Sequence, residues 1–470
     1  MSLKDDLLKV GISNLVVLLS SLVNSFFLPS VLTINGYANF KTYILYASFI
    51  GFLHFGFVDG INVKYGGVDK KKLDAKEFEQ YHSFFIIFQI FISLVFILIS
   101  LLLNDTILIF VTFAIIPVNL QSFFLFFYQA IGDFYLYARA TIIVPIISIS
   151  LTLSLILLHI IDFRIFIIIN IISYYVSIFF LEVKYNQNKK LNLKKTTKNI
   201  QQYLIMKLRR FFSVIKFHNN IFRSGFYIML GTVLFNLFFS TGLWIIKFWG
   251  NDKMFAFYSL SLSLIGVIII FVSTINKTFY PYLHKNNNID TIKKLREILY
   301  ILGTLSFSSF FILKFIIINY LPKYSNALPI TAVMIISIPG IFIVKSIYAN
   351  LYKVDKKESL FLRDTIIYLF ASIIVTLSSY FYFKSLMSIA IASVFAIYVW
   401  SLYPLSFKII KNKNRFLEIF YLTLIIFSFY IINFYETNLL LSILISLIMI
   451  SLVNILFFKQ TFLSLIRIKL

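Results

Sequence analysis

The sequence predicts an all-α polytopic membrane protein with about fourteen transmembrane helices. Of its 470 residues, 60% are apolar and only 13% are charged, whereas soluble domains carry about 25% charged residues. The mean hydropathy is +0.90, and a soluble chain with this balance could not cover its own surface. Because one span needs about 20 apolar residues, the apolar content leaves little for a large soluble domain.

The apolar runs, taken in order, begin and end at charged residues or at Gly, Pro and Asn. Runs of this length are typical of helices, whereas a membrane β-barrel would show short segments of alternating polarity. The expected spans are residues 9–29, 41–60, 83–103, 106–130, 139–161, 163–183, 225–248, 256–276, 296–319, 329–350, 364–384, 386–410, 416–434 and 438–458.

The Lys and Arg residues indicate which loops face the cytoplasm. With a cytoplasmic N-terminus, 36 of the 43 basic residues fall in inside segments and 7 fall in outside segments. Basic loops remain on the cytoplasmic side of a membrane, so this split predicts fourteen spans with both termini cytoplasmic. Loop charge therefore accounts for the net charge of +24, and no nucleic-acid partner is expected.

The longest inside loop, residues 184–224, divides the predicted spans into two groups. We expect an N-terminal six-helix lobe at 1–183, a basic cytoplasmic linker at 184–224 and a C-terminal six-helix lobe at 225–410. Residues 411–470 should form two additional helices and a cytoplasmic tail. The linker is interpreted as solvated chain near anionic lipid headgroups, and a docking site for a cytoplasmic partner is the alternative.

A shift of 214 residues superimposes similar residues from the two predicted lobes. Gly11 falls on Gly225, and residues 57–62 fall on residues 271–276. The copies are six spans apart, which is an even number, so both should face the same way across the membrane. This predicts two lobes related by a parallel pseudo-twofold axis along the membrane normal, with a cavity between them.

Polar residues inside the spans should face protein or water, because an unpaired polar group is costly in hydrocarbon. At about 100° per residue, the polar side chains of three spans each fall on one helix face. They are Asn14, Ser21 and Ser25 in the first span, Thr232, Asn236, Ser240 and Lys247 in the seventh, and Ser259, Ser263, Ser273 and Lys277 in the eighth. Helix packing for the hydroxyls and snorkelling of the lysines to the interface are the alternative interpretations.

Asp59 is the acidic residue that lies most clearly at membrane depth in the predicted spans. It is a candidate for proton or Na⁺ coupling, or for a structural pair with Lys64 at the inner boundary. His54 is a candidate proton relay, although a histidine among apolar neighbours is more often a packed core residue.

The sequence contains no motif that would carry catalysis or hold a metal. The patterns GxxxxGK[ST], HExxH and GxSxG are absent, and there is no cysteine. We therefore expect neither an ATP-driven pump nor an enzyme, and no cofactor or metal site.

Four short segments near the ends of predicted spans carry a family resemblance. They are residues 35–38 (NGYA), 56–65 (GFVDGINVKY), 279–283 (FYPYL) and 321–327 (LPKYSNA). These segments and the span spacing resemble the polysaccharide-transporter family, the Wzx-type flippases of the multidrug/oligosaccharidyl-lipid/polysaccharide exporter superfamily. Some relatives place arginines in the first span, where this chain has only Asn and Ser.

The resemblance implies a multi-pass flippase of the bacterial inner membrane. Such proteins move an undecaprenyl-diphosphate-linked oligosaccharide, an O-antigen or capsule repeat unit, from the cytoplasmic to the periplasmic leaflet by alternating access. Membrane lipid, a polysaccharide polymerase and a chain-length regulator are the further partners that it implies.

On this interpretation, basic side chains should bind the diphosphate headgroup through charge and hydrogen bonds. The candidates are Lys41, Arg139, Lys247, Lys277 and Lys345. The candidates for contact with sugar are the polar residues Asn14, Asn236 and Ser240.

Two other function classes remain open from the sequence. A drug or cation exporter of the same superfamily should carry acidic residues inside its bundles, whereas basic residues are the commoner ones at membrane depth here. An integral-membrane enzyme of envelope polysaccharide synthesis should have a sizeable outside loop, and all predicted outside loops are short.

Overall fold

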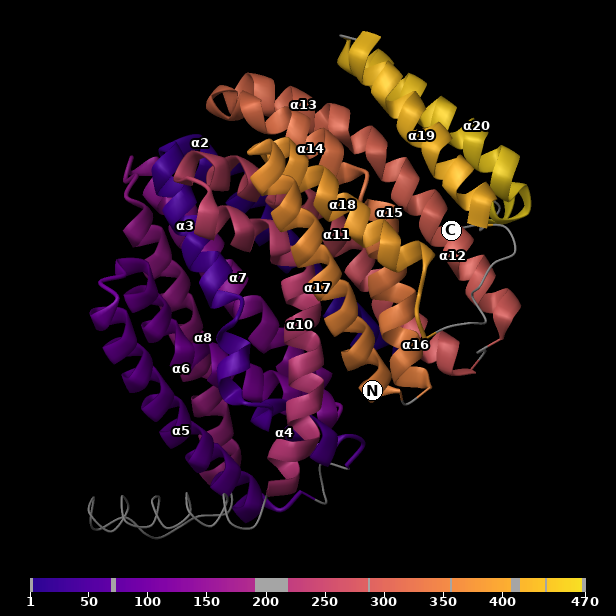
Figure 1. Cartoon of the computed structure of the whole chain (residues 1–470). Helices are drawn as coiled ribbons and strands as arrows, with labels where there is room; N and C mark the ends of the chain where they lie inside the picture. Colours follow the sequence, from indigo (N-terminus) through magenta and orange to yellow (C-terminus); the bar gives the residue numbers. More distant parts are fainter. Residues whose placement is uncertain are drawn as a thin grey trace. The chain divides into compact units, whose positions relative to one another are not determined.

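Every regular element in the described part of the chain is a helix (Figure 1). The structure is a computed structural model, and it describes residues 3–68, 73–190, 219–285, 288–355, 357–406, 415–435 and 438–466. Most of the predicted linker, residues 184–224, lies outside these ranges.

Each of the fourteen predicted spans falls on a helical segment. In the described ranges, eleven helices are long and apolar enough to cross a membrane, and the number is thirteen if each of two bent pairs forms one span. The predicted span 386–410 coincides with α18 (Leu386–Leu402), whose 17 residues are fewer than the roughly 20 that a span needs. The polytopic all-α class is confirmed, and the described ranges hold eleven to thirteen full-length spans together with the shorter apolar helix α18.

Contacts divide the chain into two units, which are described separately. Unit 1 comprises Met1–Asn24 and Val31–Val233, and unit 2 comprises Ser25–Ser30 and Leu234–Leu470. The helix α10 (Asn219–Trp249) therefore contributes residues to both units. The predicted lobe borders and the parallel superposition of the two lobes stay predictions.

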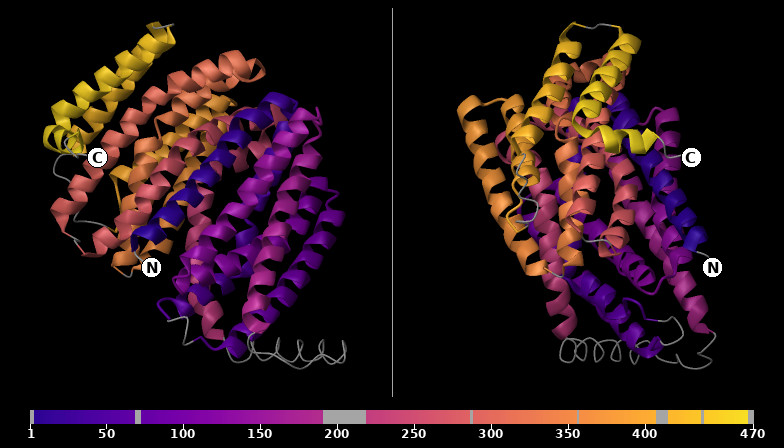
Figure 2. Two further views of the ribbon diagram at one scale, coloured as in Figure 1. Left: turned by 180° about the vertical axis from the view of Figure 1, so that it is seen from behind. Right: turned by 90° about the vertical axis from the view of Figure 1, so that its right-hand side faces the viewer.

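Unit 1 is a bundle in which α6 makes contacts with most of the other helices (Figures 1 and 2). Its α5, α6 and α7 begin after Asp74, Asp105 and Asp133, whose carboxylates accept hydrogen bonds from the first free backbone N–H groups. The helices are α1 (Leu3–Leu22), α3 (Ile34–Ala47), α4 (Phe57–Tyr65), α5 (Ala75–Leu102), α6 (Thr106–Ala130), α7 (Phe134–Leu157) and α8 (Phe163–Lys190), with the 3₁₀-helix η2 (Ile50–His54) between α3 and α4.

The core of unit 1 is aromatic and is centred on Phe57, the first residue of α4. Its ring stacks on Phe85 of α5, with 5.3 Å between the ring centres, and lies 6.4 Å from the ring of Phe123 in α6. All three side chains are fully buried. Aromatic pairs of this geometry add stabilisation beyond area burial, so they fix the position of α4 within the bundle.

The second predicted span is broken between η2 and α4, where the chain bends by 59°. Phe55 and Gly56 both adopt left-handed conformations there, with φ of 50° and 81°. Such a conformation carries little cost for glycine but strains a residue with a side chain. The sequence predicts one continuous run over residues 41–60, so this break was not predicted.

Unit 2 contains the remaining helices, and the last two pack together against α12 and α13. A buried ion pair joins Arg296 of α12 to Glu418 of α19, with 2.9 Å between nitrogen and oxygen. The elements are η1 (Val23–Phe27, which also contributes to unit 1), α2 (Leu28–Val31, mainly in unit 2), α11 (Asp252–Lys285), α12 (Ile289–Leu305), η4 (Ser306–Ser308), α13 (Ser309–Tyr320), η5 (Pro322–Ala327), α14 (Leu328–Ile335), α15 (Ile338–Ile343), η6 (Val344–Tyr348), α16 (Ala349–Val354), α17 (Glu358–Phe383), α18, α19 (Arg415–Tyr435) and α20 (Leu439–Ile466).

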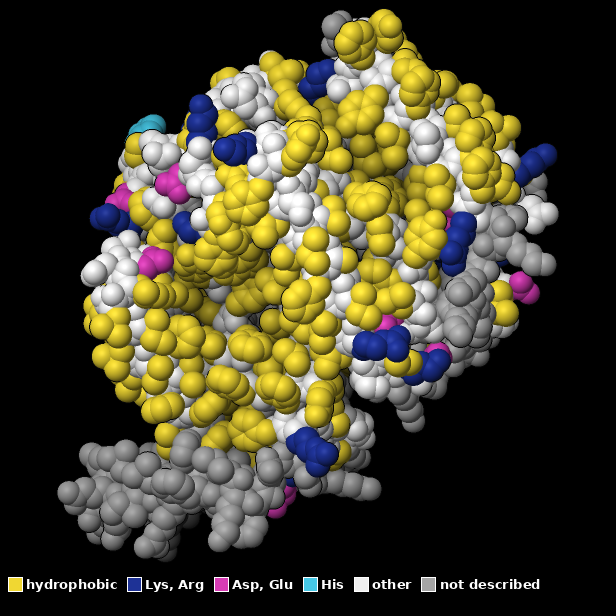
Figure 3. Space-filling model, viewed as in Figure 1, with side chains coloured by type: hydrophobic (Ala, Val, Ile, Leu, Met, Phe, Trp, Pro, Cys, Tyr) yellow, Lys and Arg dark blue, Asp and Glu magenta, His cyan; other side chains and the backbone are white. Residues whose placement is uncertain are grey.

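Large hydrophobic side chains are exposed on both units, as the face drawn in Figure 3 shows. Phe179 of α8 and Phe370 of α17, for example, are 70% and 61% exposed. A water-soluble protein rarely exposes apolar surface on this scale, whereas hydrocarbon covers it without cost. The surface therefore agrees with a multi-pass membrane protein.

Candidate substrate-binding site

Three of the five predicted headgroup residues are half-buried lysines: Lys41 in unit 1, and Lys247 and Lys345 in unit 2. The Nζ of Lys41, on α3 of unit 1, lies 5.4 Å from the centre of the Tyr37 ring. The Nζ of Lys345, in η6 of unit 2, lies 4.5 Å from the centre of the Phe239 ring. Among the described residues, neither ammonium group has a hydrogen bond or an ion pair. A ring face offsets only part of the cost of burying a cation, so both lysines are suited to receive an anion.

Lys345 is held in a π-helix, the five-residue element η6. The other four residues of this element are buried, and the Tyr348 hydroxyl donates a hydrogen bond of 2.5 Å to the carbonyl of Ser401. Turns of this kind are rare and are frequent at functional sites. Lys345 is thus the charged, half-buried member of a turn whose other residues are buried.

The other three predicted headgroup residues differ in their surroundings. Arg139 on α7 is exposed, and its guanidinium lies 4.1 Å from the centre of the Tyr135 ring. Lys247 is half-buried in the last turn of α10, 5.7 Å from the centre of the Phe255 ring. A cation at a helix C-terminus is stabilised by the helix dipole, which suits an interfacial anchor equally well. Lys277 belongs to α11, but its side chain lies outside the described residues.

The three predicted sugar-binding residues are distributed over both units. Asn14 is half-buried on α1 in unit 1. Asn236 is exposed on the unit 2 part of α10, and the half-buried Ser240 donates its hydroxyl hydrogen to the Asn236 carbonyl at 3.1 Å. A serine bonded to its own helix in this way is satisfied without a ligand, so its sugar contact stays a prediction.

Asp59 lies beside His54 at the break in the second predicted span. The His54 Nε2 is 3.7 Å from an Asp59 oxygen, and the two side chains are 7% and 13% exposed. The Nδ1 of His54 accepts a hydrogen bond of 3.1 Å from the Gly56 backbone N–H. Acceptance at Nδ1 requires a proton on Nε2 in the neutral ring, so an N–H group faces the Asp59 carboxylate.

The structural pair expected between Asp59 and Lys64 is wrong. Both residues lie on α4, and five positions place their side chains about 140° apart around the helix. Lys64 instead forms an ion pair with Glu77 and donates a hydrogen bond of 2.6 Å to the Tyr81 hydroxyl. Among the described residues, the ionisable neighbour of the Asp59 carboxylate is therefore His54 rather than a lysine.

Buried amides beside the broken span were missed by the sequence analysis. Gln89 of α5 donates to the carbonyl of Leu53 in η2 at 3.4 Å, and its own oxygen accepts from Asn119 of α6 at 2.7 Å. Gln89 and Asn119 are both completely buried. Gln89 thus supplies a partner for the Leu53 carbonyl at the break, and Asn119 holds the Gln89 amide in place. The sequence feature that could have indicated these residues is the presence of an isolated Gln or Asn inside an apolar run.

The fold of the chain is similar to that of several solved structures. No protein-family model and no curated sequence matches the chain. The structure of "Lipid II flippase MurJ, inward closed conformation" is 15% identical, with a TM-score of 0.68, and the match covers 98% of this chain and 99% of that chain.

Two transporters of the MATE family are also similar. An inward-facing multidrug resistance MATE transporter of the MOP superfamily is 12% identical, with a TM-score of 0.54, over 86% of this chain and 95% of that chain. A mutant of the Vibrio cholerae MATE transporter VcmN is 14% identical, with a TM-score of 0.53, over 88% of this chain and 97% of that chain. The chain thus shares the polytopic all-α fold of these three structures.

Proposed function

We propose that this protein is a flippase that moves an undecaprenyl-diphosphate-linked oligosaccharide across a bacterial inner membrane, from the cytoplasmic to the periplasmic leaflet. The observation that carries the proposal is the pair of half-buried lysines, Lys41 and Lys345, which lack an anionic partner among the described residues. The fold that the chain shares with the lipid II flippase supports it.

An anionic headgroup explains why a membrane protein keeps such lysines. A diphosphate and its sugars cannot cross hydrocarbon unaided, because every unpaired polar group costs kilocalories there. A lysine is a compact charge on a flexible stem, so it can follow a phosphate through a conformational change. Each of the two lysines offers a partner for the phosphate, while the polyprenyl chain remains in lipid.

Alternating access requires a source of free energy, and we propose Asp59 as the coupling residue. A carboxylate at membrane depth beside a broken helix is a suitable place for a proton or Na⁺ to bind. His54 would hold the ionised carboxylate through its Nε2–H group, and neutralising Asp59 would weaken that contact. A polysaccharide polymerase and a chain-length regulator would then act on the delivered repeat unit.

A cation exporter is the second candidate function, and Asp59 is the observation that favours it. Export of a cationic drug would need a buried carboxylate rather than lysines, and two of the similar structures are MATE transporters. Loss of such an exporter would sensitise cells to cationic drugs without changing their surface polysaccharide.

The decisive experiment is depletion of the protein in its host. On our proposal, lipid-linked repeat units accumulate and stay accessible only from the cytoplasmic face, and surface polysaccharide falls. Complementation should work with the parental gene and with Lys384→Ala, an exposed lysine in the turn before α18 that serves as a control. Normal surface polysaccharide combined with new drug sensitivity would replace the flippase proposal by the exporter.

A further inference from the structure

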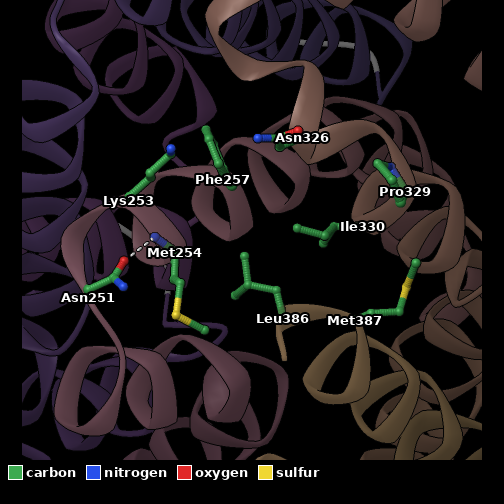
Figure 4. Close-up of a pocket in the computed structure, with 9 residues that line it drawn as sticks. All are labelled: Asn251, Lys253, Met254, Phe257, Asn326, Pro329, Ile330, Leu386 and Met387. Atoms are coloured by element: carbon green, nitrogen blue, oxygen red, sulfur yellow. Dashed lines mark hydrogen bonds between the residues drawn. The ribbon is translucent and has the colours of Figure 1, made fainter. Parts of the chain in front are cut away.

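A pocket of about 440 Å³ lies in unit 2 where three turns between helices meet (Figure 4). Its lining comes from the start of α11, from η5 with the start of α14, and from the start of α18. These turns join predicted spans 7 and 8, 9 and 10, and 11 and 12, so the predicted orientation places all three at the outer face. The volume falls within the roughly 300–1,000 Å³ of ligand sites.

The polar groups of the pocket are one cation and two amides. The Lys253 ammonium lies 5.9 Å from the centre of the Phe257 ring, and it has no anionic partner among the described residues. In Figure 4 this ammonium and the amide of Asn326 lie on the same side of the pocket, flanking Phe257. Asn251 caps α11 by accepting a hydrogen bond of 2.9 Å from the Met254 N–H, and its amide NH₂ is a further donor.

The segments around the pocket are cationic as a group. They carry Lys253, Lys323 and Lys384 against the single acid Asp252. Lys323 donates a hydrogen bond of 3.0 Å to the carbonyl of Ser30, so it supports the framework of unit 2. The positive ends of α11 and α18 also lie at the pocket and add to this field. The electrostatic potential therefore favours an anion.

The other side chains that line the pocket are apolar. They belong to Met254, Phe257, Pro329, Ile330, Leu386 and Met387, and methionine adapts readily to irregular apolar chains. A small water-soluble anion would leave these side chains without a partner. A ligand that joins a phosphate to an acyl chain would satisfy both parts, and the surrounding bilayer supplies such molecules at high local concentration.

We propose that this pocket binds an anionic phospholipid, with its phosphate at Lys253 and the Asn326 amide and the start of one acyl chain against Leu386 and Met387. From the sequence, Lys253 is expected only to lie in an outside loop. The proposal does not depend on the transported cargo, because it requires only membrane insertion.

Native mass spectrometry of the detergent-purified full-length protein tests this assignment. Titration with phosphatidylglycerol should show one lipid that binds at least tenfold more tightly than phosphatidylcholine does. Lys253→Ala should weaken this binding about tenfold, since it removes one charge-assisted contact. Leu386→Trp should abolish it by filling the pocket, and Lys384→Ala, a neighbouring exposed lysine outside the lining, should stay within twofold of the parent.

Three results would overturn the proposal. The first is equal affinity for the two lipids, and the second is an equal loss in Lys253→Ala and Lys384→Ala. The third is displacement of phosphatidylglycerol by glycerol phosphate at matching concentration, which would make the pocket a site for soluble anions. Each variant must first give the parental melting temperature and a single symmetric elution peak, so that a folding defect is not mistaken for lost binding.

Discussion

Gly225 of α10 lies against Gly56 at the break of the second predicted span, so closely that a methyl group on either would meet the backbone of the other. Both residues belong to unit 1. The contact lets the backbone of α10 reach the start of α4, and it explains why a glycine occupies the left-handed position at the break. The break in the span is therefore stabilised by packing against α10 as well as by its own backbone conformation.

Replacing Gly225 with alanine should destabilise the protein by about 1–3 kcal/mol, because the added methyl group must push two backbones apart. Thermal unfolding of the purified protein measures the change. The control is Gly11→Ala, since a methyl group there meets no atom within 4 Å. Gly11 was the predicted repeat partner of Gly225, so equal destabilisation by the two changes would contradict the packing described here.

Replacing Lys41 or Lys345 with alanine should lower surface polysaccharide at least tenfold while leaving membrane levels of the protein normal. A charge attracts a phosphate at 4 Å by about 4 kcal/mol at an effective dielectric of 20, before desolvation is subtracted. Arginine at either position should retain more transport than alanine, because the charge and the donors remain. Parental transport by both alanine variants would remove the main support for an anionic cargo.

Lys247→Ala and Lys277→Ala test the polar stripes predicted for α10 and α11. If these lysines bind cargo, each change should reduce transport without lowering protein levels, and arginine should rescue activity. Quantification of surface polysaccharide against membrane-protein abundance gives the answer. Parental transport in both variants would identify them as interfacial anchors, the role that the position of Lys247 at a helix C-terminus also suits.

Asp59→Asn should uncouple transport from the ion gradient and leave the fold intact, because the amide fills the same volume and can still accept from His54. In proteoliposomes, an imposed proton or Na⁺ gradient should accelerate the parent several-fold and leave Asp59→Asn at the rate seen without a gradient. His54→Gln should keep a gradient response, since the carboxylate remains. A full gradient response in Asp59→Asn would exclude this residue from coupling.

Removing one partner of the Arg296–Glu418 pair should destabilise the protein by about 3–5 kcal/mol, because the remaining buried charge loses its partner. Arg296→Leu and Glu418→Leu should therefore each lower the melting temperature. The double variant should recover much of the loss, since no charge then stays buried alone. An additive loss in the double variant would show that the pair acts through packing alone.

Hydropathy was sufficient to predict the spans, because twenty apolar residues in hydrocarbon have few alternatives to a helix. It could not predict the break at Gly56, since the backbone that requires this glycine belongs to Gly225. The Arg296–Glu418 pair spans 122 residues, and no local pattern connects the two.

The candidate site was predictable only in part. Lys41 and Lys345 could be named from the sequence because each lies within a predicted span, and their binding role stays a prediction. Their lack of an acidic partner could not be foreseen, because it depends on which side chains the folded bundle brings near. The pairing of Lys64 was misjudged for the same reason, since its partner Glu77 comes from the next helix.

The π-helix that carries Lys345 contains one residue more than regular α-helical hydrogen bonding needs. Deleting Ser346 should restore an α-helix and rotate everything after it by about 100° relative to α15, without altering the residue type of any other position. The orientation of α16 relative to α15 is thus encoded in the length of the chain rather than in a side chain. Homologues of different cargo preference could then diverge here by gaining or losing a single codon, a change that substitution-based comparison would overlook.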